Sequence, residues 1–198
     1  MPTTESVFDA FQYLVRHSRS VRRFDATFRI PRETLVALVS LARFCPSGQN
    51  RQPLRFFLSA EPETNDTIFP HLHWAGHLRD WDGPAVSERP TAYLLVLHDH
   101  ALAADPGQDP GIVAQTLLLG AATLGLGGCM IGSVDRVALH AELALPEPLE
   151  IRLCIALGKP AEEIQIDDVG PDGDTRYFRD ADGVHHVPKR RLESLILA

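Results

Sequence analysis

The first 46 residues carry apolar side chains at helical spacing in two separate stretches. Over residues 5–17, apolar positions recur every three or four residues, which predicts an amphipathic helix. A second helix is predicted to begin near Pro31, because proline is favoured in a helical first turn, and to end at Pro46. Its apolar stripe consists of Leu35, Leu38, Val39 and Ala42.

Short apolar runs later in the chain predict strands over residues 54–59, 91–98, 127–132 and 151–158. Residues 110–134 contain no charged side chain. The first part of this run predicts a long, buried core helix that leads into the strand at 127–132. Asp135 is predicted to cap a further helix that ends near Leu143.

The remaining segments have weaker patterns. Residues 71–81 are polar and contain two tryptophans, and we expect them to be helical in part. The acidic stretch after Gly158 is expected to form a loop. Residues 176–187 can form a hairpin around Asp182 and Gly183, and the chain from Pro188 onward reads as a short amphipathic tail.

These elements predict an α+β fold. Helices outnumber strands, the two do not alternate regularly, and there is no internal repeat, so a doubly wound sheet is disfavoured. No change in composition marks a boundary, and the 198 residues suit one domain that spans 1–198.

Charge and cysteine content restrict the class of protein. The net charge of −7 argues against a general nucleic-acid binder, but residues 1–55 carry nine arginines against four acids. An anionic ligand is therefore expected near the N-terminal third. The three cysteines are far apart and odd in number, which predicts reduced thiols and a cytoplasmic protein. Polar residues and glycines interrupt the uncharged run, so we expect no membrane span, and no signal peptide is recognised.

Two basic motifs are candidates for binding an anion. In the segment S-R-S-V-R-R-F, an extended backbone would point Arg19 and Arg22 in different directions, toward different parts of one ligand. Guanidinium groups suit phosphate, and the Ser20 hydroxyl adds a compact donor. A solvated basic face explains the segment equally simply. The same alternative applies to Lys189 and Arg191 in V-P-K-R-R-L.

The loop P-S-G-Q-N-R-Q-P, residues 46–53, contains more amides than a turn requires. Proline and glycine alone would end a helix and reverse the chain. The amides of Asn50 and Gln52 offer donors and acceptors in one plane, which suits the edge of a heterocycle.

Histidines suggest a metal site less strongly. His71, His73 and His77 include an i, i+4 pair, and His98 and His100 end a predicted strand. No cysteine or carboxylate completes a recognised spacing, so we expect no metal site. Trp74 and Trp81 could line the mouth of a ligand site, pack in the core or contribute to a subunit interface.

Four motifs follow one another along the chain, namely S-R-S-V-R-R-F after the first helix, P-S-G-Q-N-R-Q-P after the second, L-G-L-G-G-C-M-I-G, and V-P-K-R-R-L. Their order resembles that of the FMN-dependent nitroreductase family. The resemblance extends from about residue 12 to residue 197. It implies an α+β sandwich with a mostly antiparallel central sheet flanked by helices and a long buried core helix. It also implies an obligate homodimer with two FMN sites at the interface.

The resemblance also implies roles for individual residues. Arg19 would bind the FMN phosphate with Ser20 nearby, and Arg22 would lie at the N1 and C2-carbonyl edge of the isoalloxazine. Ser47, Asn50 and Gln52 would contact the flavin that the other subunit mainly binds. Further contacts would come from a strand end facing the ring and from a basic pair at the phosphate, namely Ile131, Gly132, Ser133, Lys189 and Arg191.

The implied activity is oxidation of NAD(P)H. Hydride would pass to flavin N5 and then to a small organic acceptor, such as a nitroaromatic or a quinone, in a ping-pong cycle. A specialised flavin dehydrogenase or dehalogenase of the same fold is one alternative, and a flavin-binding module without turnover is another. The acceptor, the choice between NADH and NADPH and the extent of arm exchange between subunits stay open.

Overall fold

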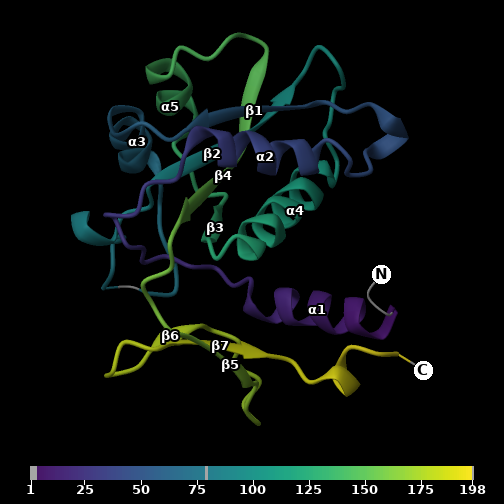
Figure 1. The fold of residues 1–198 in the computed structure, drawn as a ribbon, viewed down its shortest axis with the longest axis vertical. Helices are drawn as coiled ribbons and strands as arrows, with labels where there is room; N and C mark the ends of the chain where they lie inside the picture. Colours follow the sequence, from purple (N-terminus) through teal and green to yellow (C-terminus); the bar gives the residue numbers. More distant parts are fainter. Residues whose placement is uncertain (1–3, 79, 198) are drawn as a thin grey trace.

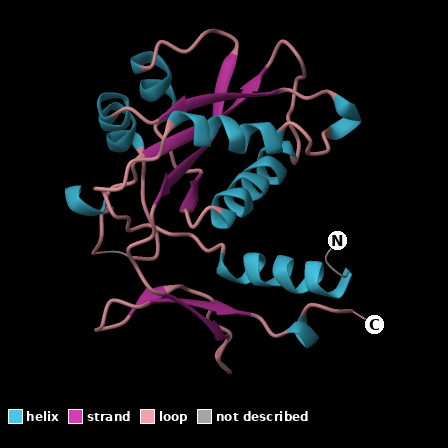
Figure 2. Cartoon of the chain, viewed as in Figure 1, coloured by secondary structure: helices cyan, strands magenta, loops and turns pink. Residues whose placement is uncertain are grey.

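Four antiparallel strands form the central sheet of the described part of the chain, which Figures 1 and 2 show from one side. The computed structural model describes residues 4–78 and 80–197. The strand order is β1-β2-β4-β3, so strands that are consecutive in sequence are not all neighbours in space. Their bounds are Leu54–Ser59 for β1, Ala92–Asp99 for β2, Gly127–Ile131 for β3 and Leu149–Gly158 for β4.

The two central strands are buried because their sequences are almost continuously apolar. All eight residues of β2 are buried, and β2 is paired with β1 on one side and β4 on the other. Alternate residues point to opposite faces, so Leu94 and Val96 join one core while Tyr93 and Leu95 join another. A strand that is buried on both faces needs helices above and below it.

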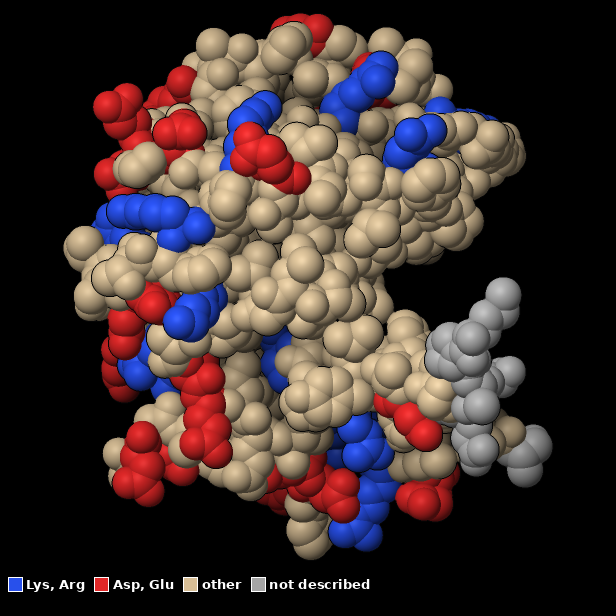
Figure 3. All heavy atoms as spheres, viewed as in Figure 1, with Lys and Arg blue, Asp and Glu red and all other residues tan. Residues whose placement is uncertain are grey.

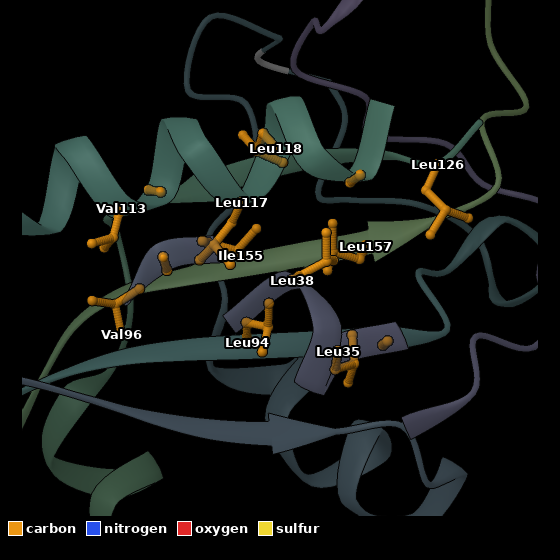
Figure 4. Close-up of a cluster of buried hydrophobic side chains, with 14 of the residues drawn as sticks. Leu35, Leu38, Leu94, Val96, Val113, Leu117, Leu118, Leu126, Ile155 and Leu157 are labelled. Atoms are coloured by element: carbon orange, nitrogen blue, oxygen red, sulfur yellow. The ribbon is translucent and has the colours of Figure 1, made fainter. Parts of the chain in front are cut away.

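Helices cover both faces of the sheet. One face packs against α2, Arg32–Ala42, and α4, Asp109–Thr123, in the cluster drawn in Figure 4. The other face packs against α3, Pro62–Ile68, and α5, Arg136–Glu142. Leu35, Leu38 and Leu117 are among the least exposed side chains in the first cluster. Burying each such leucine contributes about 1.5 to 3 kcal/mol.

A second, smaller sheet lies apart from the first, on the far side of α1 in Figure 1. It contains β5, Ile164–Asp168, which runs parallel to β7, His185–Lys189, and the short β6, Phe178–Arg179, which runs antiparallel to β7. Helix α1, Thr4–His17, lies between this sheet and the body, beside α4. Short 3-10 turns complete the fold at Gly48–Asn50, Phe69–His71, Val86–Glu88 and Leu192–Ser194.

The α+β fold with an antiparallel central sheet, predicted from the sequence, is confirmed. Helix α5 is capped as expected, because the Asp135 carboxylate accepts a hydrogen bond from the Ala138 backbone N–H. The hairpin around Gly183 also forms, between β6 and β7. The long helix α4 buries the side that faces the sheet and α2, whereas Gly111, Ile112 and Gln115 are exposed on its other side.

Three local predictions were wrong or incomplete. Apart from the 3-10 turn that ends at His71, the described residues between 71 and 81 are not helical, and Leu72 instead pairs with Val134 as an isolated bridge. The stretch after Gly158 is not simply a loop, since it contains β5, which is held by pairing with a distant strand. Helix α3 was not anticipated because its seven residues are mostly polar.

Residues 110–134, which carry no charge, were expected not to span a membrane. None of the helices in the described part of the chain is long and apolar enough to cross a membrane.

The three cysteines, Cys45, Cys129 and Cys154, are all free thiols, and the last two are buried.

Candidate functional site

The segment that follows α1 runs along the exposed edge of the central sheet. Ser20 pairs with Gly128 of β3 in a parallel bridge, and the Val21 backbone N–H donates to the Gly128 carbonyl at 3.0 Å. The approach is close because β3 begins with two glycines. A Cβ on Gly127 would lie 2.7 Å from the Val21 side chain, inside the contact distance of two carbon atoms. The glycines therefore fix segment 19–22 against β3.

Arg19 lies two residues beyond the C-terminal end of α1 and is partly buried. Its guanidinium donates to the backbone carbonyls of Val15 and Ser18, both at 2.8 Å. Burial lowers the pKa of Arg19 from its usual value. Arg16 and Arg19 line one side of a hollow of about 500 Å³, and Gln165 and Ile166 of β5 line another side. An anion in this hollow would offset the cost of desolvating the arginine.

Arg22 is more deeply placed, with 9% of its surface exposed. Its Nη1 donates to the Ser20 carbonyl at 3.2 Å and to His185 Nε2 at 3.1 Å, and its guanidinium carbon lies 4.8 Å from the centre of the Tyr177 ring. Burial, helped by the Arg22 charge, lowers the pKa of His185 to about 4. The neutral imidazole accepts from the arginine, so a cation is held in one position beside β3.

Glu162 connects this segment to the smaller sheet. Its side chain is 1% exposed, and one carboxylate oxygen accepts the backbone N–H groups of Arg22 and of Arg23, the latter at 3.0 Å. The other oxygen accepts from Arg179 Nη2 at 2.8 Å. Glu162 was not predicted from the sequence, because nothing in the acidic stretch around it distinguishes one buried carboxylate from its exposed neighbours.

The loop 46–53 is anchored to the first turn of α4. The Ser47 hydroxyl donates to Asp109 Oδ2 at 2.6 Å, and the Gly48 N–H donates to Asp109 Oδ1 at 3.1 Å. The Gln52 N–H then donates to the Ser47 hydroxyl at 2.9 Å. Ser47, predicted to contact a ligand, is therefore occupied in shaping the loop. Asp109 was not anticipated as its anchor, since D-P-G signals only a helix start.

The same loop holds three non-glycine residues in the left-handed region. Gln49, Asn50 and Gln52 have φ angles of 54°, 55° and 51°. Each such residue costs on the order of 1 kcal/mol, and such strain gathers at ligand-binding sites. The side chains of all three are exposed, and Gln52 Nε2 contacts the Asn50 side-chain oxygen at 3.1 Å. A hollow of about 510 Å³ lies between this loop and residues 105–112.

The other predicted contacts lie on two further elements. At the end of β3, Ile131 is buried, while Gly132 and Ser133 are exposed and their carbonyls accept from Arg136 Nη2 at 2.6 Å and from the His73 N–H at 3.0 Å. Lys189 ends β7 and is exposed. Arg191, two residues later, forms an exposed ion pair with Asp168 at 3.4 Å.

A single chain does not gather all of these residues in one pocket. The 15 residues of α4 span about 22 Å at 1.5 Å per residue. The loop 46–53 is anchored at the first residue of α4, whereas β3, with segment 19–22 beside it, follows the last. Asn50 and Gln52 therefore lie at the opposite end of α4 from Ser20.

The tryptophans and histidines singled out in the sequence have separate environments. Trp74 is buried in the core beneath the sheet, with its ring centre 6.3 Å from that of Trp81. Arg179 lies over the Trp81 ring at 4.5 Å. The three histidines of segment 71–77 do not converge. The His71 ring contacts Glu142, the His73 backbone N–H donates to the Ser133 carbonyl, and the His77 ring lies against Tyr177.

Comparison with known proteins relates this arrangement to one family. The model of the nitroreductase family matches residues 15–159. A Methanothermobacter thermautotrophicus protein, named as an NADH dehydrogenase/NAD(P)H nitroreductase, is 29% identical over 178 residues, which is 86% of this chain and 83% of the relative.

Solved structures with a similar fold are also described as nitroreductases. A Desulfovibrio desulfuricans protein, described as a nitroreductase and crystallised with FMN, has a TM-score of 0.67 and 25% identity, and the match covers 95% of each chain. A Parabacteroides distasonis structure has a TM-score of 0.65 with 21% identity, covering 78% of this chain and 89% of that one. The family model spans most of the chain, from the end of α1 to the end of the central sheet. The resemblance seen in the sequence is therefore confirmed. The chain belongs to the nitroreductase family and is an oxidoreductase of that family.

Proposed function

We propose that this chain is an FMN-dependent oxidoreductase that passes reducing equivalents from NAD(P)H to a small organic acceptor, and that residues 1–198 form one FMN-binding domain. The observation that carries the proposal is the basic segment fixed along β3, in a chain that matches the FMN-bound relative over 95% of its length. The M. thermautotrophicus relative, by its name, points to a nicotinamide as the reductant.

The donor set of the N-terminal segment fits such a cofactor. Arg19 lines a hollow of a size that suits a ligand, and its desolvated guanidinium is suited to a phosphate. Ser20 is exposed beside it. Lys189 and Arg191 would add positive charge at the phosphate once Arg191 leaves its exposed pair with Asp168, which is a weak interaction.

Arg22 would act through its fixed charge. When bound, FMN would supply two-electron chemistry at its N5 atom, so no nucleophile or acid–base pair of the protein is required. Negative charge that develops at the N1 and C2-carbonyl edge would be stabilised by a cation that does not have to reorganise. The contacts of Arg22 with the Ser20 carbonyl and His185 provide this fixed position. The exposed Gly132 and Ser133 would face the ring.

The loop 46–53 is proposed to serve the site of a second subunit. Asn50 and Gln52 are exposed and lie at the other end of α4 from segment 19–22, so their amides are available to a flavin bound mainly by a partner chain. A homodimer is supported by the exposed apolar side chains of Phe8 and Phe11 on α1 and of Phe44 in the turn after α2. Figure 3 shows a notch between α1 and the body, with mostly uncharged atoms on the side of the body.

The test is the visible spectrum of the purified protein, reconstituted with FMN if necessary, before and after anaerobic addition of NADPH or NADH. We expect a flavin spectrum that bleaches with nicotinamide and returns when a quinone or a nitroaromatic is added. A flavin that stays oxidised with both nicotinamides would contradict the proposed reductant and favour a non-catalytic role. A protein that does not bind FMN would overturn the proposal.

A further inference from the structure

A group of metal-binding side chains lies where β2 and β4 meet. His98 is the penultimate residue of β2 and pairs directly with Glu150 of β4, while His100 follows the strand. His100 Nε2 lies 3.0 Å from Glu150 Oε2, and His98 Nδ1 lies 3.9 Å from the same oxygen. One nitrogen of each imidazole and one carboxylate oxygen all lie within 4.8 Å of one another.

The tautomer of His98 is determined by its other contact. Its Nε2 lies 2.9 Å from the Ala103 backbone carbonyl, which can only accept, so Nε2 carries the hydrogen. In the neutral ring Nδ1 is therefore an acceptor. This atom is buried, the whole residue is 0% exposed, and Nδ1 has no hydrogen-bond partner among the residues that the structure describes. A buried lone pair that faces a carboxylate without a hydrogen bond is unfavourable, and a cation between them would remove the cost.

The arrangement matches what a metal ligand needs. A metal-binding histidine usually donates its second ring N–H to a carbonyl or carboxylate, as His98 does to Ala103. Glu150 is oriented by Arg152, which donates to Oε1 at 2.9 Å and leaves Oε2 toward the two histidines. In a tetrahedral zinc site, with bonds of about 2.0 to 2.1 Å, ligand atoms lie about 3.3 Å apart. The distances from Glu150 Oε2 to His100 Nε2, 3.0 Å, and to His98 Nδ1, 3.9 Å, lie on either side of this value.

We propose that His98 Nδ1, His100 Nε2 and the Glu150 carboxylate bind one divalent transition-metal ion, with Zn²⁺ the best match. Two imidazoles and one carboxylate favour Zn²⁺ over Mg²⁺ or Ca²⁺, which prefer oxygen ligands. His100, Glu150 and residues of α5, including His140, line an adjoining hollow of about 410 Å³. Water from this hollow can fill the fourth position.

This proposal differs from the expectation drawn from the sequence. No carboxylate stood at a recognised spacing from His98 and His100, but antiparallel pairing brings Glu150 to them from about fifty residues away. The site would join the end of β2, the start of β4 and the connection that begins at His100. Its role would be structural, and it is independent of the proposed flavin chemistry.

The experiment is a titration of the full-length protein, freed of metal with EDTA, by Zn²⁺ in competition with a chromophoric chelator. We expect one tight site per chain, a rise in melting temperature with Zn²⁺, and no comparable effect of Mg²⁺. His100→Ala and Glu150→Gln should each weaken the site at least tenfold. Both residues are partly exposed, so neither change should prevent folding.

His140→Ala is the matched control, because it removes an imidazole from the same hollow without touching the three ligands. Substitution with Co²⁺ should give visible absorption bands typical of four-coordinate nitrogen and oxygen ligation in the parent and in His140→Ala. An equally tight site in His100→Ala, or no tight site in the parent protein, would overturn the proposal. FMN content, measured in the same samples, is expected to be independent of Zn²⁺.

Discussion

At the scale of single residues, a buried carboxylate determines where the basic segment lies. Glu162 accepts two consecutive backbone N–H groups, of Arg22 and Arg23, and the guanidinium of Arg179. Arg22 in turn contacts His185 and Tyr177 of the C-terminal part. The position of the proposed cofactor-binding cation therefore depends on a residue that would not itself touch the cofactor.

Glu162→Gln is expected to destabilise the protein by about 3 kcal/mol, because Arg179, whose side chain is only 11% exposed, would lose its charged partner. Urea unfolding of the two proteins measures the difference. Asp174→Asn is a suitable control, since it removes an acid from an exposed pair with Arg176 in the same region. Equal, small effects of the two substitutions would show that the Glu162 contacts are dispensable.

Arg19→Ala and Arg191→Ala are expected to weaken FMN binding while the fold is retained. Each charge-assisted phosphate contact is worth on the order of 1.5 to 3 kcal/mol, which is roughly tenfold to a hundredfold in affinity. Quenching of flavin fluorescence during titration measures the affinity. Arg176→Ala, which removes an exposed guanidinium elsewhere, should bind FMN like the parent. Unchanged affinity in both test variants would exclude these residues as the phosphate site.

At the scale of elements, the smaller sheet is attached to the body by a few polar contacts rather than by a shared apolar core. His185 of β7 meets Arg22, and the Ala161 N–H donates to the Arg23 carbonyl at 3.0 Å. The histidine next to it has the opposite environment. His186 contacts Asp167 at 2.7 Å and Asp180 at 3.1 Å, and these hydrogen bonds raise its pKa.

The adjacent histidines predict opposite dependences of stability on pH. The pKa of His185 falls to about 4 on folding, from an ordinary value of about 6.5. Between these pH values the unfolded chain binds a proton that the folded chain does not. The contribution of His185 to the free energy of unfolding is therefore complete above pH 6.5 and is lost as the pH falls toward 4. The raised pKa of His186 gives a contribution that is complete below pH 6.5 and is lost at higher pH.

Urea unfolding at several pH values, in the absence of FMN, tests the pair. His185→Gln should lose less stability than the parent protein as the pH is lowered from 6.5 to 4. His186→Gln should lose less stability than the parent as the pH is raised through 6.5. The same response in both variants would contradict the different environments of the two rings.

At the scale of the whole molecule, α1 exposes an apolar face that a single chain does not cover. Val7, Phe8 and Phe11 are each more than half exposed, although the helix has the periodicity of a packed element. Helix α2, which packs on α4 as α1 does, also has exposed apolar side chains, including Val36 and Leu41. Exposed apolar side chains gathered on the helices in this way are typical of a subunit interface.

We expect the double variant Phe8→Glu/Phe11→Glu to weaken dimerisation by at least a factor on the order of 100, because burial of each phenylalanine is worth about 1.5 to 3 kcal/mol. Sedimentation velocity over a range of concentrations measures the association. Val137→Glu, which changes an exposed apolar residue on α5, should leave dimerisation unaffected. A monomeric parent protein would contradict the proposed two-chain site.

The sequence by itself determined the elements whose pattern is local. The apolar periodicity of α1 and α2, the continuous apolar run of β2 and the Asp135 cap were all predictable, because they depend on neighbouring residues. The basic segment after α1 and the amide-rich loop could also be selected in advance. Their residue types and spacing predict ligand-binding segments before any fold is known.

Only the tertiary structure decided what lies beside these elements. β5 forms because a strand about twenty residues later pairs with it, and Asp109 shapes the loop 46–53 from the first turn of a different helix. Glu162 reaches the backbone of Arg22 across 140 positions of sequence, and Glu150 meets His98 through strand pairing. Contacts between distant residues are set by packing and register, which leave no local signal in the sequence.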